Sequence, residues 1–197
     1  STMAAAALTR NLTRKTIPAM YGTSRTAGKA LARIPFQENT DLLIDEINKA
    51  WNKKYIPKPK VGKNIENDVR TIFTIESYAD KTGIQYVLDF NAQYTLEQAM
   101  TIITMLKEKK CLLNNVLFIE QPTLESEGIS ALKTFKVFLE KTALREIPVV
   151  ADESFVTVTD AVECAEHRIE LNFKIHKVGG LFHAKEIAES LLHNTNQ

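Results

Sequence analysis

The sequence predicts an α/β fold in which parallel strands alternate with helices. Short apolar segments rich in β-branched residues recur along the chain, and each is followed by a stretch with apolar residues at helical spacing. Strands that are apolar on both faces are typical of a parallel sheet that is covered on both sides. The regular alternation indicates βαβ units with right-handed crossovers, so successive strands should lie side by side in chain order.

The first helix is expected over 40–54, where apolar residues recur at helical spacing and Thr40 is a candidate N-cap. The extended segment 55–62 follows this helix and should contain a strand. A second helix should then run from Asn64, another candidate N-cap, to Gly83, because glycine commonly ends a helix.

Four further strand–helix units continue the pattern, and a strand near 33–38 brings the total to about six parallel β/α units. Thr95 and Thr157 stand where two of these helices should begin, since threonine is a favoured N-cap. Beyond the strand near 33–38, strands are expected at 56–61, 84–90, 115–120, 147–152 and 170–175, and the four further helices at 95–110, 129–142, 157–168 and 181–194.

The composition is that of an ordinary globular protein and excludes several classes. Hydrophobic residues make up 44% of the chain, and the net charge of +1 indicates neither nucleic acid nor a membrane surface as a partner. No apolar run reaches the roughly 18 residues of a transmembrane helix, and the glycine-rich motifs that cradle phosphates are absent. Cys111 and Cys164 form no CxxC pair, so we expect two buried, reduced thiols in an intracellular protein.

The first 37 residues have a different character, because they contain no Asp or Glu but several Arg and Lys residues. Three interpretations stay open. The segment is either a basic surface arm, a remnant of a linker between domains, or a retained targeting segment that would place the protein in mitochondria. Pro18 and Pro35 argue against one long helix in this segment. We therefore assign 1–37 to an irregular basic N-terminal arm and 38–197 to the β/α domain.

Polar residues stand at or near the carboxyl ends of five successive strands. In a parallel barrel these ends form the face on which active sites assemble. Lysine, aspartate, glutamate, aspartate and lysine occur there in this order, which chance placement would rarely produce. The residues are Lys58 and Lys60, then Asp89, Glu120, Asp152 and Lys174.

Together, the segments around these residues resemble the signature of the enolase superfamily, most closely its muconate-lactonizing and dipeptide-epimerase branch. The resemblance covers roughly residues 55–190 and implies a TIM-type (β/α) barrel. The barrel would be incomplete, because the last two β/α units and most of the capping domain of the family are missing. The segments are KPKVGK (58–63), LDFNAQYT (88–95), FIEQP (118–122), VVADES (149–154) and NFKIHKVGG (172–180).

The resemblance also implies a role for each residue of the set. Three carboxylates would bind Mg²⁺, which prefers hard oxygen ligands and could stabilise the enediolate that forms when an α-proton leaves. Two lysines on opposite sides could remove and return that proton, and lysine bases working with Mg²⁺ are a known pattern of this superfamily. The metal ligands would be Asp89, Glu120 and Asp152, the acid/base pair Lys60 and Lys174, and Lys58 would face the carboxylate of the substrate.

Three functions therefore stay open. The chain is a magnesium-dependent epimerase, racemase or cycloisomerase acting on a small carboxylate substrate, or it is an inactive, truncated relative that serves as a subunit of a larger assembly. A third possibility is a split enzyme that another chain completes.

Pro57 and Pro59 favour an open barrel, because proline cannot donate to a neighbouring strand and is typical of sheet edges. An unpaired edge and an exposed apolar inner face invite association. We therefore expect a protein partner, a second copy or the N-terminal arm to cover the open side.

Overall fold

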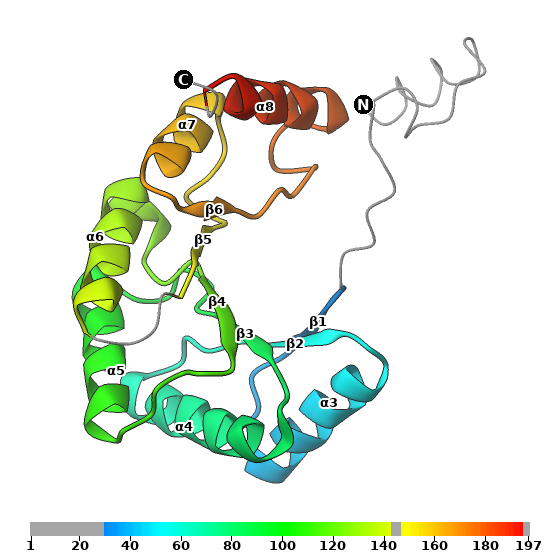
Figure 1. Cartoon of the computed structure of the whole chain (residues 1–197), viewed down its shortest axis with the longest axis vertical. Helices are drawn as coiled ribbons and strands as arrows, with labels where there is room; N and C mark the ends of the chain where they lie inside the picture. Colours follow the sequence, from blue (N-terminus) through cyan, green and yellow to red (C-terminus); the bar gives the residue numbers. More distant parts are fainter. Residues whose placement is uncertain (1–29, 143–146, 195–197) are drawn as a thin grey trace.

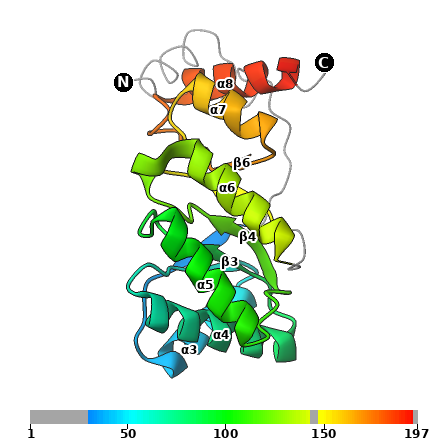
Figure 2. The same ribbon diagram turned by 90° about the vertical axis from the view of Figure 1, so that its left-hand side faces the viewer.

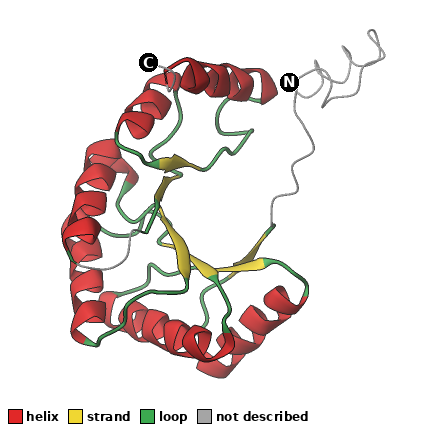
Figure 3. Ribbon diagram, viewed as in Figure 1, coloured by secondary structure: helices red, strands yellow, loops and turns green. Residues whose placement is uncertain are grey.

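The computed structural model describes residues 30–142 and 147–194 as a curved row of strands with helices along its outer side (Figure 1). Colouring by secondary structure shows this division into an inner row of strands and an outer layer of helices (Figure 3). A view turned by 90° shows helices α5, α6 and α7 covering the outer side of the strands (Figure 2).

The strands are β1 (Leu31–Ile34), β2 (Ile56–Pro59), β3 (Tyr86–Asp89), β4 (Val116–Glu120), β5 (Val149–Ala151) and β6 (Glu170–Leu171). The helices are α3 (Thr40–Asn52), α4 (Ile65–Thr82), α5 (Leu96–Glu108), α6 (Gly128–Lys141), α7 (Val158–Glu166) and α8 (Leu181–Asn194), with a short 3-10 helix, η1 (Glu125–Glu127), before α6.

Every strand pair in the described part of the chain is parallel. Strand β1 pairs with β2, and β3, β4, β5 and β6 form a second sheet in chain order. A single bridge between Lys60 and Asp89 joins the two sheets. The prediction of sequential parallel β/α units in an incomplete TIM-type barrel is confirmed.

The interruption between β2 and β3 has a cause in the sequence. The backbone N–H of Lys60 donates toward β1, whereas that of Val61 donates to the carbonyl oxygen of Asp89, 2.9 Å away. Alternate residues of a strand face the same neighbour, so positions 57 and 59 face β3 together with Val61. Pro57 and Pro59 have no N–H to donate, and the hydrogen-bond ladder to β3 forms only beyond them.

Most helix ends lie where the sequence predicts them. The side chain of Asn64 caps α4, Gly83 ends it with a left-handed φ of 73°, and Thr95 and Thr157 form capping boxes on α5 and α7. The N-cap of α3 is a correction. Asn39, and not Thr40, accepts hydrogen bonds from the first turn, and Thr40 is the first helical residue.

The two ends of the strand row differ from expectation. Strand β6 covers only two residues of the expected 170–175, and Lys174 lies in the loop that follows it. Strand β1 lies within the range 1–37 that we assigned to the arm and pairs with β2, so the sheet begins before residue 38. Residues 1–29 lie outside the described residues, and so does the choice between a surface arm and a targeting segment.

The core fills the space between the strands and the helices. Cys111 and Cys164 are buried there as free thiols, as predicted. No helix among the described residues is both long and apolar enough to cross a membrane. The largest side chains without exposed surface include Tyr86, Phe90, Phe135 and Phe155.

Candidate active site

The carboxyl ends of the middle strands bring charged side chains into the interior. Asp89 ends β3, Glu120 ends β4, and Asp152 follows β5 directly. These three residues are only 5%, 1% and 2% exposed, in that order, and Lys58 on β2 is 7% exposed. Charges that are buried to this extent require partners.

Lys58 is the partner of two of these carboxylates. Its Nζ lies 2.9 Å from both carboxylate oxygens of Glu120 and 3.1 Å from Oδ2 of Asp89. Asn172 adds a hydrogen bond of 2.8 Å from its Nδ2 to Oε1 of Glu120. The ammonium group of Lys58 therefore lies between the carboxylates of two neighbouring strands.

Burial and charge set the pKa values of this group. Burial lowers the pKa of Lys58, but the hydrogen bond to Glu120 and the charge of Asp89 outweigh it, so the pKa of Lys58 lies above its ordinary value. Burial raises the pKa of Glu120, and the hydrogen bond from Lys58 opposes this rise only in part because Asp89 repels the same carboxylate. One ammonium group is thus shared by two buried acids.

Lys60, two residues further along, lies beside this pair. Its Nζ donates to Oδ1 of Asn91 and lies 3.9 Å from Oδ2 of Asp89. The backbone N–H of Asn91 in turn donates to Oδ1 of Asp89 at 3.0 Å. The side chain of Lys60 is 24% exposed, so it is less covered than that of Lys58, at 8%.

Asp152 has a separate set of partners. Lys174 donates to Oδ2 of Asp152, and the Nζ of Lys177 lies 3.2 Å from Oδ1 and also donates to the backbone carbonyl of Asp152. Burial alone would raise the pKa of Asp152, but the hydrogen bonds from the two lysines lower it below the usual range.

Sequence reasoning did not single out Lys177. Lys174 and Lys177 are three residues apart, and the backbone N–H of Lys177 donates to the carbonyl oxygen of Lys174 at 2.8 Å. A lysine three residues after Lys174, separated only by Val178 from two consecutive glycines, is the signal in the sequence that could have indicated it.

Gln121 holds the end of β5 in position. Its Oε1 accepts hydrogen bonds from the backbone N–H groups of Asp152 and Ser154, at 2.9 and 3.2 Å. Its Nε2 donates to Oγ of Ser154 at 2.7 Å, and its side chain is fully buried. Gln121 thereby ties the loop that carries Asp152 to the end of β4.

The three carboxylates form two groups, each neutralised by lysine. Among the residues that the structure describes, no three His, Cys, Asp or Glu side chains are gathered closely enough to hold a metal ion. The chemistry of the donors nevertheless fits Mg²⁺, which prefers carboxylate oxygens. The ammonium group of Lys58 is a stand-in cation, since it shows that Asp89 and Glu120 can hold a positive charge between them.

A pocket of about 390 Å³ lies on the inner side of the strands, next to Glu120. Its lining is mainly apolar, as expected for the inner face of a barrel, with Glu120 and Asn172 among the polar residues. The residues are Leu31, Phe118, Glu120, Pro148, Val150, Glu170, Leu171 and Asn172.

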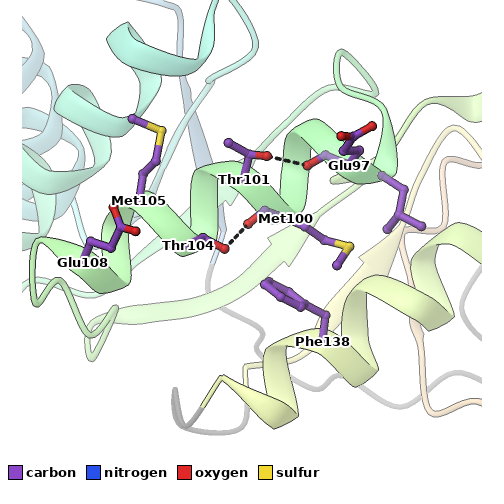
Figure 4. A pocket seen from close by; sticks show the side chains of 8 residues that line it. Glu97, Met100, Thr101, Thr104, Met105, Glu108 and Phe138 are labelled. Carbon is purple, nitrogen blue, oxygen red and sulfur yellow. Dashed lines mark hydrogen bonds between the residues drawn. The ribbon is translucent and has the colours of Figure 1, made fainter.

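A second pocket, of about 510 Å³, lies on the outer surface between α5 and α6 (Figure 4). The hydroxyls of Thr101 and Thr104 donate to carbonyl oxygens of their own helix, so the pocket presents mainly methyl groups, thioethers and the ring of Phe138. No strand-end residue lines it. Because a binding site needs convergent polar groups, we place the chemistry at the strand ends.

Comparison with known proteins identifies the family of the chain. A family model described as "Enolase C-terminal domain-like" matches residues 42–192. Among curated proteins, the L-amino acid-D/L-Glu epimerase of Sulfurimonas denitrificans is 29% identical over 170 residues, which are 85% of this chain and 46% of that protein. The L-Ala-D/L-Glu epimerase of Francisella tularensis subsp. novicida is 29% identical over 132 residues, which are 66% of this chain and 34% of that protein.

Solved structures share the fold. A dipeptide epimerase from Cytophaga hutchinsonii, complexed with Mg and the dipeptide D-Ala-L-Val, has a TM-score of 0.73 at 22% identity, over 90% of this chain and 46% of that one. The muconate lactonizing enzyme from Pseudomonas putida has a TM-score of 0.69 at 22% identity, over 90% of this chain and 47% of that one. The chain thus spans about half the length of these structures and half or less of the curated relatives.

Proposed function

Because the chain belongs to the enolase C-terminal domain-like family, we propose that it is a magnesium-dependent isomerase of the epimerase, racemase or cycloisomerase type. The reaction would remove a proton from the carbon next to a carboxylate or carbonyl group and return it. The observation that supports this proposal most strongly is the row of buried carboxylates with a partly exposed lysine at each end, Lys60 on the side of β2 and Lys174 on the side of β6.

We further propose a dipeptide as the substrate. Two curated relatives are named L-amino acid-D/L-Glu epimerase and L-Ala-D/L-Glu epimerase, and one solved structure of a dipeptide epimerase contains the dipeptide D-Ala-L-Val. The α-carbon of a dipeptide residue lies next to a carbonyl group, so its proton is the one that such chemistry would exchange.

Asp89 and Glu120, which share the ammonium group of Lys58, would hold Mg²⁺, and Asp152 would join them only after leaving Lys174 and Lys177. A bound Mg²⁺ would neutralise the negative charge that develops on the substrate oxygen. Replacing Asp89 by Asn removes one anionic ligand, so we expect Asp89→Asn to weaken Mg²⁺ binding in calorimetry.

The two lysines would divide the proton transfer between them. One lysine, in its neutral form, accepts the proton, so that the Cα–H bond breaks and an Nζ–H bond forms. The other lysine, protonated, gives a proton to the opposite face, so that its N–H bond breaks and a new Cα–H bond forms. The configuration at the carbon is thereby inverted, and the two lysines exchange protonation states.

The test is an epimerisation assay with L-Ala-L-Glu and related dipeptides, in which chiral chromatography resolves the products. We expect a second epimer with the unmodified chain and Mg²⁺, and none after chelation with EDTA. Lys60→Met and Lys174→Met should abolish the reaction. The matched control is Lys63→Met, because Lys63 lies over the ring of Phe36 and outside the charged cluster. A folded chain that converts no dipeptide with Mg²⁺ would contradict the proposal.

A specific feature favours a second function, that of a non-catalytic subunit in a larger assembly. In the described part of the chain, β1 pairs only with β2 and β6 only with β5, so each keeps one open edge. Open edges are suited to pairing with another chain. Formation of a complex together with absent epimerisation would favour this function over the enzyme.

A further inference from the structure

We propose that Lys58 is an internal cation that competes with a divalent metal ion for Asp89 and Glu120. The proposal rests on the proposed function, because that function assigns these two carboxylates to Mg²⁺. It adds a step to metal binding, since the ammonium group of Lys58 must leave before the metal ion can take its place. Metal affinity would then depend on a residue that is not itself a ligand.

The first argument is the geometry around the ammonium group. Three carboxylate oxygens, from Asp89 and Glu120, lie within 3.1 Å of Nζ of Lys58. The side chains of Lys58, Asp89 and Glu120 are exposed by only 8%, 6% and 1%. The ammonium group therefore takes the place that a cation bound by both carboxylates would need.

The second argument is the position of the two acids in the sheet. Asp89 and Glu120 are register partners on the neighbouring strands β3 and β4, so their side chains are held side by side. Like charges directly opposite each other repel, and burial strengthens the repulsion. A cation is required between them, and in the chain without metal Lys58 supplies it.

The third argument concerns how Lys58 could leave. Pro57 and Pro59 flank it, each fixes its own backbone φ, and residues that precede proline are restricted to extended backbone. Strand β2 is also held in register with β1. The ammonium group of Lys58 must therefore leave the two carboxylates by rotation of the lysine side chain and not by movement of the strand. A pocket of about 390 Å³ is lined by Glu120, the carboxylate to which Lys58 donates.

The test is the affinity for Mn²⁺, which shares with Mg²⁺ a preference for oxygen ligands, measured by calorimetry on the full chain. Lys58→Met and Lys58→Gln remove the competing charge, so we expect both to bind Mn²⁺ about tenfold or more tightly than the unmodified chain. The control is Lys136→Met, which removes a largely covered lysine that pairs with Glu140 on α6 and should leave the affinity unchanged. Without metal, Lys58→Met should melt at a lower temperature than the unmodified chain, and Mn²⁺ should raise its melting temperature by more.

The outcomes separate this proposal from the proposed function. Equal Mn²⁺ affinities of the unmodified chain and Lys58→Gln would overturn the competition and leave the metal site intact. If neither the unmodified chain nor any variant binds Mn²⁺, both the competition by Lys58 and the proposed metal-dependent function are overturned. Lys58→Gln keeps a group that can donate a hydrogen bond to a carboxylate, so it decides the question if Lys58→Met does not fold without metal.

Discussion

Within the candidate site, three carboxylates meet four lysines. Asp89 and Glu120 share Lys58, Lys60 lies beside Asp89, and Asp152 has Lys174 and Lys177. Lysine ammonium groups thus supply the positive charge that these buried acids require. The balance of charge in the site therefore depends on the protonation of its lysines, and pH should affect it.

The pKa of Lys58 predicts how stability changes at high pH. Its pKa in the folded chain is raised above the ordinary 10.5, so its charge stabilises the fold below that pH, and the stabilisation is lost as the pH rises through the folded value. As the pH rises above 10.5, the urea midpoint of the unmodified chain should therefore fall more than that of Lys58→Gln. An equal fall of the urea midpoint in both proteins would contradict the prediction, since the other titrating groups are common to both.

Residue types and their order could be predicted from the sequence, but contacts could not. The strand ends identified Asp89, Glu120 and Asp152 because parallel strands place their carboxyl ends on one face. The position of Lys58 between two carboxylates depends on distances across three strands, which the spacing along the chain does not contain. The role of Lys177 depends on a turn where we expected the end of a strand.

Among the elements, the turn after β2 has no room for a side chain at Gly62. Gly62 has a φ of +122°, and a Cβ added there would lie 2.7 Å from Cγ of Gln93 and 3.1 Å from the carbonyl oxygen of Phe90. Its backbone N–H donates to the buried carboxylate of Asp68 at 2.5 Å. This turn fixes the end of the strand that carries Lys58.

We expect Gly62→Ala to lower the free energy of unfolding by about 3 kcal/mol, from backbone strain and overpacking together. The matched control is Gly83→Ala at the end of α4, where φ is +73° and no atom lies within 4 Å of the added Cβ. It should cost about 1 kcal/mol, because only the left-handed backbone is penalised. Equal losses for the two variants in urea denaturation would contradict this account of the turn.

The elements were predicted best where local signals decide them. Caps such as Asn64 and Thr95 act within one turn of a helix, so the sequence locates them directly. Asn39 and Thr40 are both good N-cap residues, and only the observed hydrogen bonds show that Asn39 caps α3. Strand β6 is shorter than its apolar pattern indicates, because it pairs on one side only and Phe173 and Ile175 beyond it remain exposed.

At the scale of the whole molecule, the row of strands remains open in the described part of the chain. Strands β1 and β6 stand at its two ends (Figure 1). The pocket between them is lined by apolar side chains such as Leu31, Phe118 and Leu171. An apolar inner face next to unpaired strand edges favours association.

We therefore expect residues 1–197 to associate in solution. Light scattering during size exclusion should give a mass above the 22.2 kDa of one chain, or a partner should copurify in defined proportion. Binding of a dye specific for exposed apolar surface reports whether the inner face is covered. A monodisperse species of one chain that binds no such dye would contradict this expectation.

The central claim is that Lys60 and Lys174 exchange a proton on opposite faces of one α-carbon. Deuterium incorporation tests it most directly, when each epimer of Ala-Glu is incubated separately with Mg²⁺ in D₂O and followed by mass spectrometry. Lys60→Met and Lys174→Met should each stop epimerisation. Each variant should still exchange the α-proton of one epimer for deuterium, and the epimer that exchanges should differ between the two variants. The claim would be contradicted if both variants exchanged both epimers. It would also be contradicted if neither the two variants nor the folded unmodified chain exchanged either epimer.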